Sequence, residues 1–190
     1  MKKEKELLIK KFLFYDLHYG SSKLTMNLTS KSHLIGVRNG FCILDLRETR
    51  LYLRYAINFL KRLLTSRKKI LFLGGPLGLE KEFGSLCLKK KHPWVETWSY
   101  GLLTNPGQSY GDKSFFKYGK PSLIFIFDLS LYEEAIKEAL RLDIPIMAFV
   151  NTDESLEIVD YPIPANVKSM MGGRFTYNFF FYLFQLYQKN

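Results

Sequence analysis

The chain has 190 residues, of which 47% are hydrophobic, and its 28 Lys and Arg outnumber its 18 Asp and Glu, so that the net charge is +10. This length and apolar content predict one folded domain over residues 1–190 and exclude a disordered chain. The positive charge favours a polyanionic partner, either nucleic acid or an anionic membrane surface.

Two further features narrow the class of protein. Cys42 and Cys87 are the only cysteines, so a disulfide framework or a CxxC zinc site cannot be assembled, and a reducing compartment is expected. The opening MKKEKELLIKKF resembles neither a signal peptide nor a transit peptide, so we expect the protein to work where it is made. The apolar tail from Phe175 to Leu186 is shorter than the roughly 20 residues that cross a bilayer, which favours a buried terminal helix.

The sequence of the N-terminal third predicts an arm, a β-hairpin and then a helix. Residues 1–30 are expected to form an N-terminal arm with one short helix near Glu4 to Phe14. Strand-like segments at 34–37 and 41–44 flank the turn signal Arg38-Asn39-Gly40. Asp45 precedes Glu48 at capping-box spacing, and the helix that follows, through Ser66, has an apolar face and a basic face.

The rest of the α/β core, which spans 31–166, predicts repeated strand-helix units. Buried strands are expected at 70–73, 94–98, 123–127 and 144–150, and helices at 79–89 and, from a capping box of Ser130 with Glu133, through Leu142. Residues 102–119 are expected to form a loop, and 167–190 a C-terminal helix. The pattern predicts an α/β Rossmann-like doubly wound parallel sheet with helices on both faces.

A glycine-rich turn, Gly74 to Gly78, follows the strand at 70–73 and invites a phosphate-binding interpretation. The turn matches neither GxGxxG nor a P-loop, so a nucleotide-binding protein or enzyme is kept only as the alternative. Asp128 and Asn151 end predicted strands, where ligands bind in such sheets, although capping also suits Asp128. The three histidines lie far apart in the sequence, and no catalytic residue is predicted.

The lysine and arginine runs are each typical of a solvated face, but together they suit a protein that binds many phosphates of a folded RNA. Trp98 and its aromatic neighbours could stack on unpaired bases, although aromatic residues in a short strand more often belong to the core. Pro162-Ile163-Pro164 predicts a rigid extended crossing that excludes both helix and sheet ladder.

Four stretches in fixed order carry a resemblance: GVRNGFCILDL (36–46), SYGLLTN (99–105), IPIMAFVNTD (144–153) and DYPIPAN (160–166). They resemble the universal family of small-subunit ribosomal protein two in its bacterial and organellar form. The resemblance implies a Rossmann-like fold, no enzymatic activity, no cofactor, no small-molecule substrate and no membrane. It also implies binding to small-subunit rRNA and to other small-subunit ribosomal proteins.

The candidate rRNA-binding residues come from two sources. Arg38, Asn39, Trp98 and Asn105 fall in motifs that lie near RNA in the family, whereas Lys23 and Arg174 are added from charge and loop context. Only about 15 residues separate Asn105 from Lys120, so the family's inserted helical hairpin is expected to be absent or reduced. Ser21 replaces a second His, which weakens any zinc site, and Ala165 replaces a usual Gly. These departures favour a mitochondrial ribosome, with a plastid or the bacterial cytoplasm as alternatives.

Overall fold

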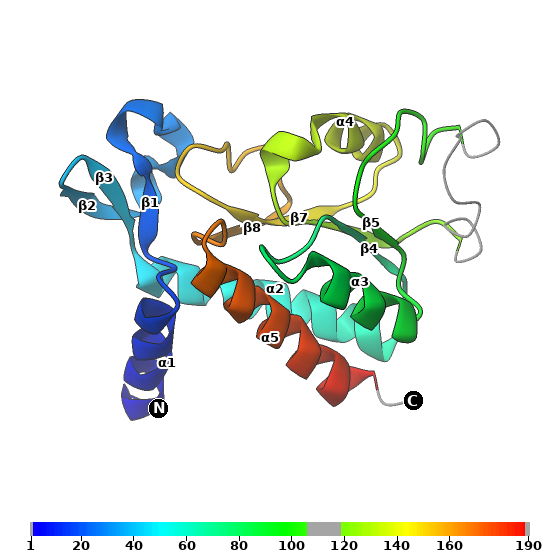
Figure 1. Cartoon of the computed structure of the whole chain (residues 1–190), viewed down its shortest axis with the longest axis horizontal. Coiled ribbons are helices and arrows are strands. Elements are labelled where there is room, and N and C mark those ends of the chain that lie inside the picture. Colours follow the sequence, from blue (N-terminus) through cyan, green and yellow to red (C-terminus); the bar gives the residue numbers. More distant parts are fainter. Residues whose placement is uncertain (1, 106–118, 189–190) are drawn as a thin grey trace.

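The computed structural model describes residues 2–105 and 119–188, in which helices flank one large sheet and a small sheet lies at one end (Figure 1). The α-helices are α1 (Lys2–Phe14), α2 (Leu46–Thr65), α3 (Glu80–Lys89), α4 (Glu133–Arg141) and α5 (Met170–Tyr187). The strands are β1 (Tyr19–Ser22), β2 (Leu34–Arg38), β3 (Phe41–Leu44), β4 (Ile70–Leu73), β5 (Trp94–Val95), β6 (Leu123–Ile126), β7 (Ile146–Val150) and β8 (Tyr161–Pro164). Short 3₁₀ turns are η1 (Lys23–Thr25), η2 (Leu28–His33) and η4 (Leu129–Leu131).

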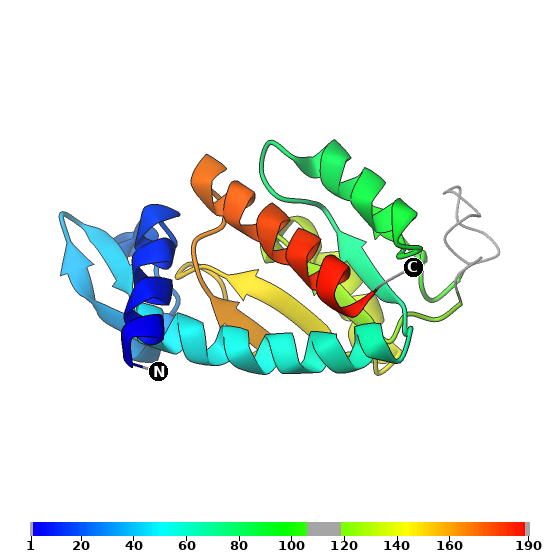
Figure 2. The same cartoon turned by 90° about the horizontal axis from the view of Figure 1, so that it is seen from below.

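The large sheet is parallel throughout and has the strand order β5-β4-β6-β7-β8. The helices α2, α3 and α5 cover one face and α4 covers the other, as Figures 1 and 2 show. Alternate residues of each strand serve the two faces: Phe72 belongs to the cluster under α2, α3 and α5, whereas Leu71 and Leu73 pack toward α4. The predicted doubly wound α/β fold is therefore confirmed, because continuous apolar strands need cover on both sides.

Phenylalanine rings fill the larger face. The ring of Phe180, on α5, lies 4.7 Å from that of Phe125 and 5.1 Å from that of Phe72, in edge-to-face geometry. Aromatic pairs in this geometry add about 0.5–1.5 kcal/mol beyond the burial of their area. The apolar tail is thus a helix that packs on the sheet, and no helix in the described part of the chain is long and apolar enough to span a bilayer.

The proline segment 162–164 forms a strand, so the prediction that it excludes a ladder was wrong. β8 pairs in parallel with β7, with Pro162 opposite Ala148 and Pro164 opposite Val150. β8 is the last strand of the sheet. The N–H of Ala165 donates to Val150 O, and because successive peptides point to opposite sides, the two prolines turn their missing N–H groups toward the free edge.

Helix starts agree only in part with the capping predictions. Asp45 caps α2, because its carboxylate accepts from the N–H of Arg47. The return bond of a capping box is not made, since the N–H of Asp45 donates to His33 O. At the next predicted box Ser130 is not the cap: Asp128 accepts from Ser130 N–H and caps η4, and α4 begins after Tyr132 without a side-chain cap.

The N-terminal segment is more ordered than an arm with one helix. After α1, β1 joins the hairpin β2–β3 in an antiparallel sheet of order β1-β3-β2. The hairpin turn consists of Asn39 (φ 51°) and Gly40 (φ 81°), and positive φ at both positions is the two-residue turn that suits twisted strands. The expected strand 94–98 shortens to β5, and the expected change to the family hairpin lies in 106–118, outside the described residues.

Candidate nucleic-acid interface

The β2–β3 hairpin brings three of the candidate residues together. Lys23, Arg38 and Asn39 are all exposed, and the N–H of Lys23 donates to Gly40 O across the turn at 2.9 Å. Arg38 and Asn39 thus lie at the hairpin turn itself, and Lys23, in η1, lies beside it. The positive φ of Asn39 also gives this residue a backbone role, because Asn tolerates the left-handed region better than most residues.

The small sheet is held against the carboxyl edge of the large sheet by partly buried hydrogen bonds. The N–H of Ser21 donates to Thr152 Oγ1 at 2.7 Å, and the amide of Asn151 donates to Ser21 Oγ at 3.1 Å. A side chain at Gly20 would meet Thr152 at 2.6 Å, so the close approach requires glycine. Asn151, which the sequence placed at a strand end where ligands bind, is instead part of this junction.

Trp98 and Asn105 lie in a different place, where the segment after β5 crosses α4. Buried Glu138 of α4 accepts hydrogen bonds from Trp98 Nε1 at 3.2 Å, from the backbone N–H groups of Gly101, Leu103 and Thr104 at 2.8–3.2 Å, and from Thr104 Oγ1 at 3.3 Å. Burial raises the pKa of Glu138, but these hydrogen bonds outweigh it and the pKa is lowered. The indole N–H of Trp98 is thus committed to the fold, whereas Asn105 is exposed at the end of the segment.

Arg174 stands apart from both groups, exposed in the second turn of α5. The six candidate residues therefore occupy three places: the hairpin turn, the segment held by Glu138, and the start of α5. Figure 1 shows the small sheet at one end of the molecule and the β5–α4 region toward the other.

The outer face of α2 adds cations that were predicted only as a basic helix face. α2 buries Leu53, Leu60 and Leu64. Its exposed positions include Arg54, Lys61 and Arg62, and Arg67 and Lys68 follow directly after the helix. We call these five residues the α2 basic band. The helical spacing of the apolar residues was the sequence signal that placed them outside.

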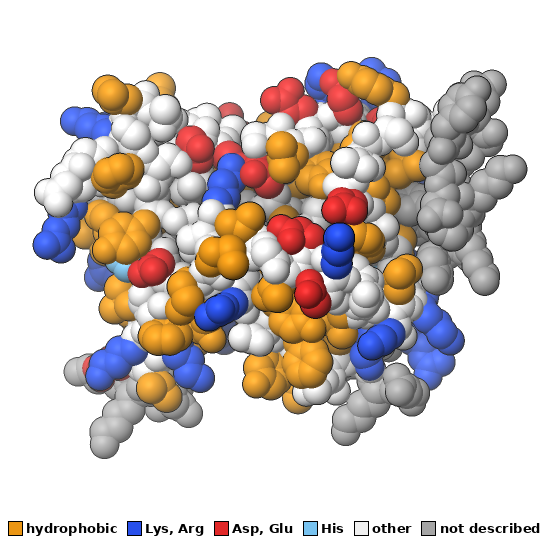
Figure 3. Space-filling model, in the orientation of Figure 1, with side chains coloured by type: hydrophobic (Ala, Val, Ile, Leu, Met, Phe, Trp, Pro, Cys, Tyr) orange, Lys and Arg blue, Asp and Glu red, His pale blue; other side chains and the backbone are white. Residues whose placement is uncertain are grey.

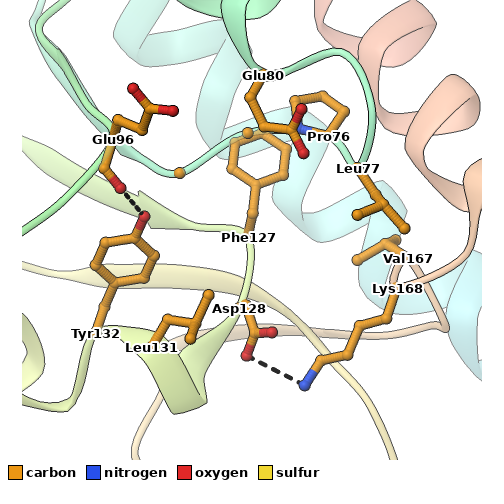
Figure 4. Close-up of a pocket in the computed structure, with 12 residues that line it drawn as sticks. Pro76, Leu77, Glu80, Glu96, Phe127, Asp128, Leu131, Tyr132, Val167 and Lys168 are labelled. Atoms are coloured by element: carbon orange, nitrogen blue, oxygen red, sulfur yellow. Dashed lines mark hydrogen bonds and ion pairs between the residues drawn. The ribbon is translucent and has the colours of Figure 1, made fainter.

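The carboxyl edge of the large sheet, where the alternative function would reside, is acidic. A cavity of about 280 Å³ lies there, at the point where the chain changes direction between β4 and β6, and its wall includes Gly74, Gly75, Phe127, Tyr132 and Val167. Its charged wall residues are Glu80, Glu96, Asp128 and Lys168 (Figure 4). Among the described wall residues, three thus carry a carboxylate and one an ammonium, and this excess of negative charge repels phosphate.

A side chain of the protein itself already accepts a hydrogen bond from the glycine turn. The N–H of Gly78 donates to the Glu80 carboxylate at 2.9 Å, so the acid takes the position that an anion would need. Gly74 and Gly78 have φ of 73° and 74°, which accounts for glycine at both positions. The turn is therefore a packing element and not a phosphate cradle.

Lys168 forms two ion pairs at the carboxyl edge of the large sheet. Its Nζ lies 3.1 Å from Asp128 Oδ1 and 3.1 Å from Glu154 Oε1. Burial raises the pKa of Asp128, but hydrogen bonds from Ser130 and Lys168 outweigh it and the pKa is lowered. For Glu154 burial prevails and its pKa is raised. Over the part of the chain that the structure describes, no three His, Cys, Asp or Glu side chains are grouped to hold a metal ion.

The comparison with known proteins decides the family. The family model of ribosomal protein S2 matches residues 12–114 and 111–180. The chain belongs to the ribosomal protein S2 family. Its role is accordingly that of a structural constituent of the small ribosomal subunit.

Bacterial relatives agree with this family over most of their length. A protein of Coprothermobacter proteolyticus named small ribosomal subunit protein uS2 is 26% identical over 198 residues, covering 83% of this chain and 74% of that protein. Its namesake in Helicobacter hepaticus is 27% identical, covering 83% and 75%. That of Campylobacter lari is 26% identical over 193 residues, covering 79% and 73%. The ribosomal protein S2 core thus extends through both sheets of this chain.

Proposed function

We propose that this S2-family chain binds small-subunit rRNA and neighbouring small-subunit ribosomal proteins, without catalysis, in a mitochondrial ribosome. The observation that carries the RNA-binding part is the α2 basic band together with the cationic hairpin turn of Lys23 and Arg38. Exposed cations along one helix and one turn can contact successive phosphates of a folded RNA, and such contacts add up without reading sequence.

Charge segregation supports this assignment of surfaces. On the face drawn in Figure 3, acidic side chains gather across the centre, whereas Lys and Arg lie more at the lower and left margins. RNA phosphates are attracted to the margins and repelled from the centre. Of the face drawn in Figure 3, we therefore assign the lower and left margins to rRNA and the acidic centre to protein neighbours.

The hydrogen bonds made by His92 and by the glycine turn support the proposal that the protein is not catalytic. His92 is buried, and its ring bonds the N–H of Ile70 at 3.2 Å and the side chain of Gln188 at 3.0 Å. The glycine turn is closed by Glu80. Asp128, the second feature behind the alternative of a nucleotide-binding enzyme, caps η4 and pairs with Lys168. These groups therefore serve the fold, which weighs against that alternative.

The mitochondrial assignment rests on composition and on departures from the family pattern. The 16 Phe and 12 Tyr belong to codon classes rich in A and T, and Ala165 stands where the motif usually has Gly. The bacterial relatives leave a bacterial or plastid ribosome as the alternative. Fractionation of the source cells tests this point: the protein should sediment with the small ribosomal subunit of purified mitochondria.

Binding to RNA is tested with the isolated protein and a transcript of the small-subunit rRNA from its own organism. Affinity should fall steeply as salt rises, because each phosphate contact releases counterions. Replacing Arg54, Lys61 and Arg62 with Gln should reduce the slope of log affinity against log salt by about 2–3. The matched triple Lys120→Gln, Lys137→Gln, Arg141→Gln, around α4, should leave it unchanged. Equal slopes for the two triple variants would refute the assignment of the α2 basic band to rRNA.

A further inference from the structure

A second cavity, of about 200 Å³, lies where the end of α1 meets the beginning of α5. We call it the α1–α5 pocket. Its wall includes Phe14, Tyr15, Met171, Arg174, Tyr177 and Asn178. It is smaller than the roughly 300–1,000 Å³ of pockets for drug-sized ligands, and it suits one flat group.

The aromatic wall is held in place by packing. The ring of Tyr15 lies 5.6 Å from that of Phe175, and the ring of Phe14 lies 5.2 Å from that of Tyr15 in edge-to-face geometry. The ring of Phe12 is 5.7 Å from that of Phe175, so α1 is anchored to α5 beside the pocket. These contacts fix the aromatic rings of the pocket wall in place without a ligand, so that a flat group can stack on them.

Phe14 is not covered by the chain itself. It is 67% exposed, although Phe12, two residues earlier on the same helix, is fully buried. Exposed aromatic rings next to cations are the elements from which single-stranded nucleic acid sites are built.

The charge of the side chains that line the α1–α5 pocket favours an anionic ligand. Within the described lining, Arg174 is the one charged side chain, and no carboxylate is present. Lys10 is exposed one helical turn before Phe14, at a spacing that places both on the same side of α1. The cavity at the carboxyl edge of the sheet has the opposite balance, with three carboxylates, so the two cavities cannot share a class of ligand.

We propose that the α1–α5 pocket holds one unpaired rRNA base, stacked on Phe14 and Tyr177, while Arg174 contacts the adjoining phosphate. Asn178 offers both a donor and an acceptor to the edge of the base. This inference rests on the proposed rRNA binding and adds to it a site for a single nucleotide, where stacking contributes beside charge.

The test separates stacking from charge in the full-length protein. Binding of a single-stranded oligoadenylate of six nucleotides is measured by fluorescence anisotropy over a range of salt concentrations. Phe14→Leu should weaken binding about tenfold, because it removes an aromatic ring on which a base stacks, and should leave the salt slope unchanged. Arg174→Gln should lower the slope by about 0.7, the value for one contact to a single strand.

Matched variants make both outcomes decisive. Phe14→Tyr keeps the ring and should bind as the wild type does, whereas a merely structural role of the exposed ring would not distinguish Leu from Tyr in this way. Tyr182→Leu, at another exposed ring that does not line the pocket, should have no effect. If Phe14→Leu binds like Tyr182→Leu while the wild type binds with a normal salt slope, the pocket assignment is overturned and the rRNA-binding proposal stands. If the wild type shows no salt-dependent binding to the rRNA transcript, the proposed function itself fails.

Discussion

Glu138 shows how one buried side chain can organise a whole segment. A carboxylate accepts up to about four hydrogen bonds through its lone pairs, and here donors from Trp98 to Thr104 converge on both oxygens. The segment carries two of the candidate rRNA-binding residues, Trp98 and Asn105. Its shape in this chain is thus set by an acid on a different element, α4.

Replacing Glu138 with Gln should destabilise the protein by roughly 2–3 kcal/mol, because the charge is lost and an amide N–H₂ faces backbone donors. Urea unfolding at pH 7 measures the change. The control is Glu134→Gln, one turn earlier on α4, whose ion pair with Lys137 is partly exposed and should contribute less than about 1 kcal/mol. Equal effects for the two variants would show that Glu138 does not organise the segment.

His92 makes stability depend on pH. Burial lowers its pKa from 6.5 to about 4, against the raising effect of the bond to Gln188. The folded pKa lies below the unfolded one, so the stability is complete above pH 6.5 and is lost as the pH falls toward 4. A decrease from 6.5 to about 4 corresponds to roughly 3 kcal/mol.

The check is urea unfolding of wild type and His92→Gln between pH 7.5 and 4. Both proteins lose stability as carboxylates titrate, so the difference between them carries the information. That difference should shrink by roughly 3 kcal/mol over the range, since only the wild type must protonate a buried imidazole. Parallel pH profiles would exclude His92 as the cause.

At the scale of elements, α5 is positioned by glycines at its first turn. A Cβ on Gly173 would lie 2.5 Å from Leu77 O, and one on Gly172 would lie 2.7 Å from Asn166 O. Both obstacles are backbone atoms, which cannot move aside as a flexible side chain could. Small residues here let the helix rest on the glycine turn after β4, so that its phenylalanines reach the sheet.

Gly173→Ala should therefore destabilise the protein by about 1–3 kcal/mol, the usual cost of overpacking, even though alanine favours helices. Thermal unfolding monitored by circular dichroism measures the effect. Gly36→Ala is the control, because a Cβ at Gly36 meets nothing within 4 Å. A Gly173→Ala variant as stable as wild type would mean that α5 does not depend on this contact.

β8 illustrates how an element can evade a local rule. Two prolines in three residues argue against a strand anywhere inside a sheet. An edge strand pairs with a neighbour on one side only. Prolines whose missing N–H groups face the other side therefore do not interrupt the ladder. Thr49 Oγ1 also donates to Pro164 O at 2.6 Å, so α2 satisfies a carbonyl on the side where no strand follows.

At the scale of the whole molecule, charge is distributed unevenly around the fold. The excess of ten positive charges does not extend to the carboxyl edge of the large sheet, where Glu80, Glu96 and Asp128 surround the first cavity. The site at which doubly wound proteins bind ligands is thereby closed to phosphate. The cations at the margins are the surface that we propose for rRNA.

The sequence by itself determined the fold class, the helix with a basic face and the family. Apolar runs such as 123–127 and the helical spacing of Leu53, Leu60 and Leu64 are local patterns, and local patterns are sufficient where burial follows directly from them. Motif order was sufficient for the family, because several separated stretches recur together.

Only the tertiary structure decided which residues lie together. The joining of Lys23 to the hairpin turn, the acid of α4 beneath the Trp98 segment, and the pairing of a proline strand at an edge all depend on contacts between residues far apart in sequence. Likewise no local sequence pattern predicted β1, because the partners of its hydrogen bonds, β3 and Thr152, lie far away in the sequence. Such contacts are set by the packing of whole elements, which no stretch of the chain encodes alone.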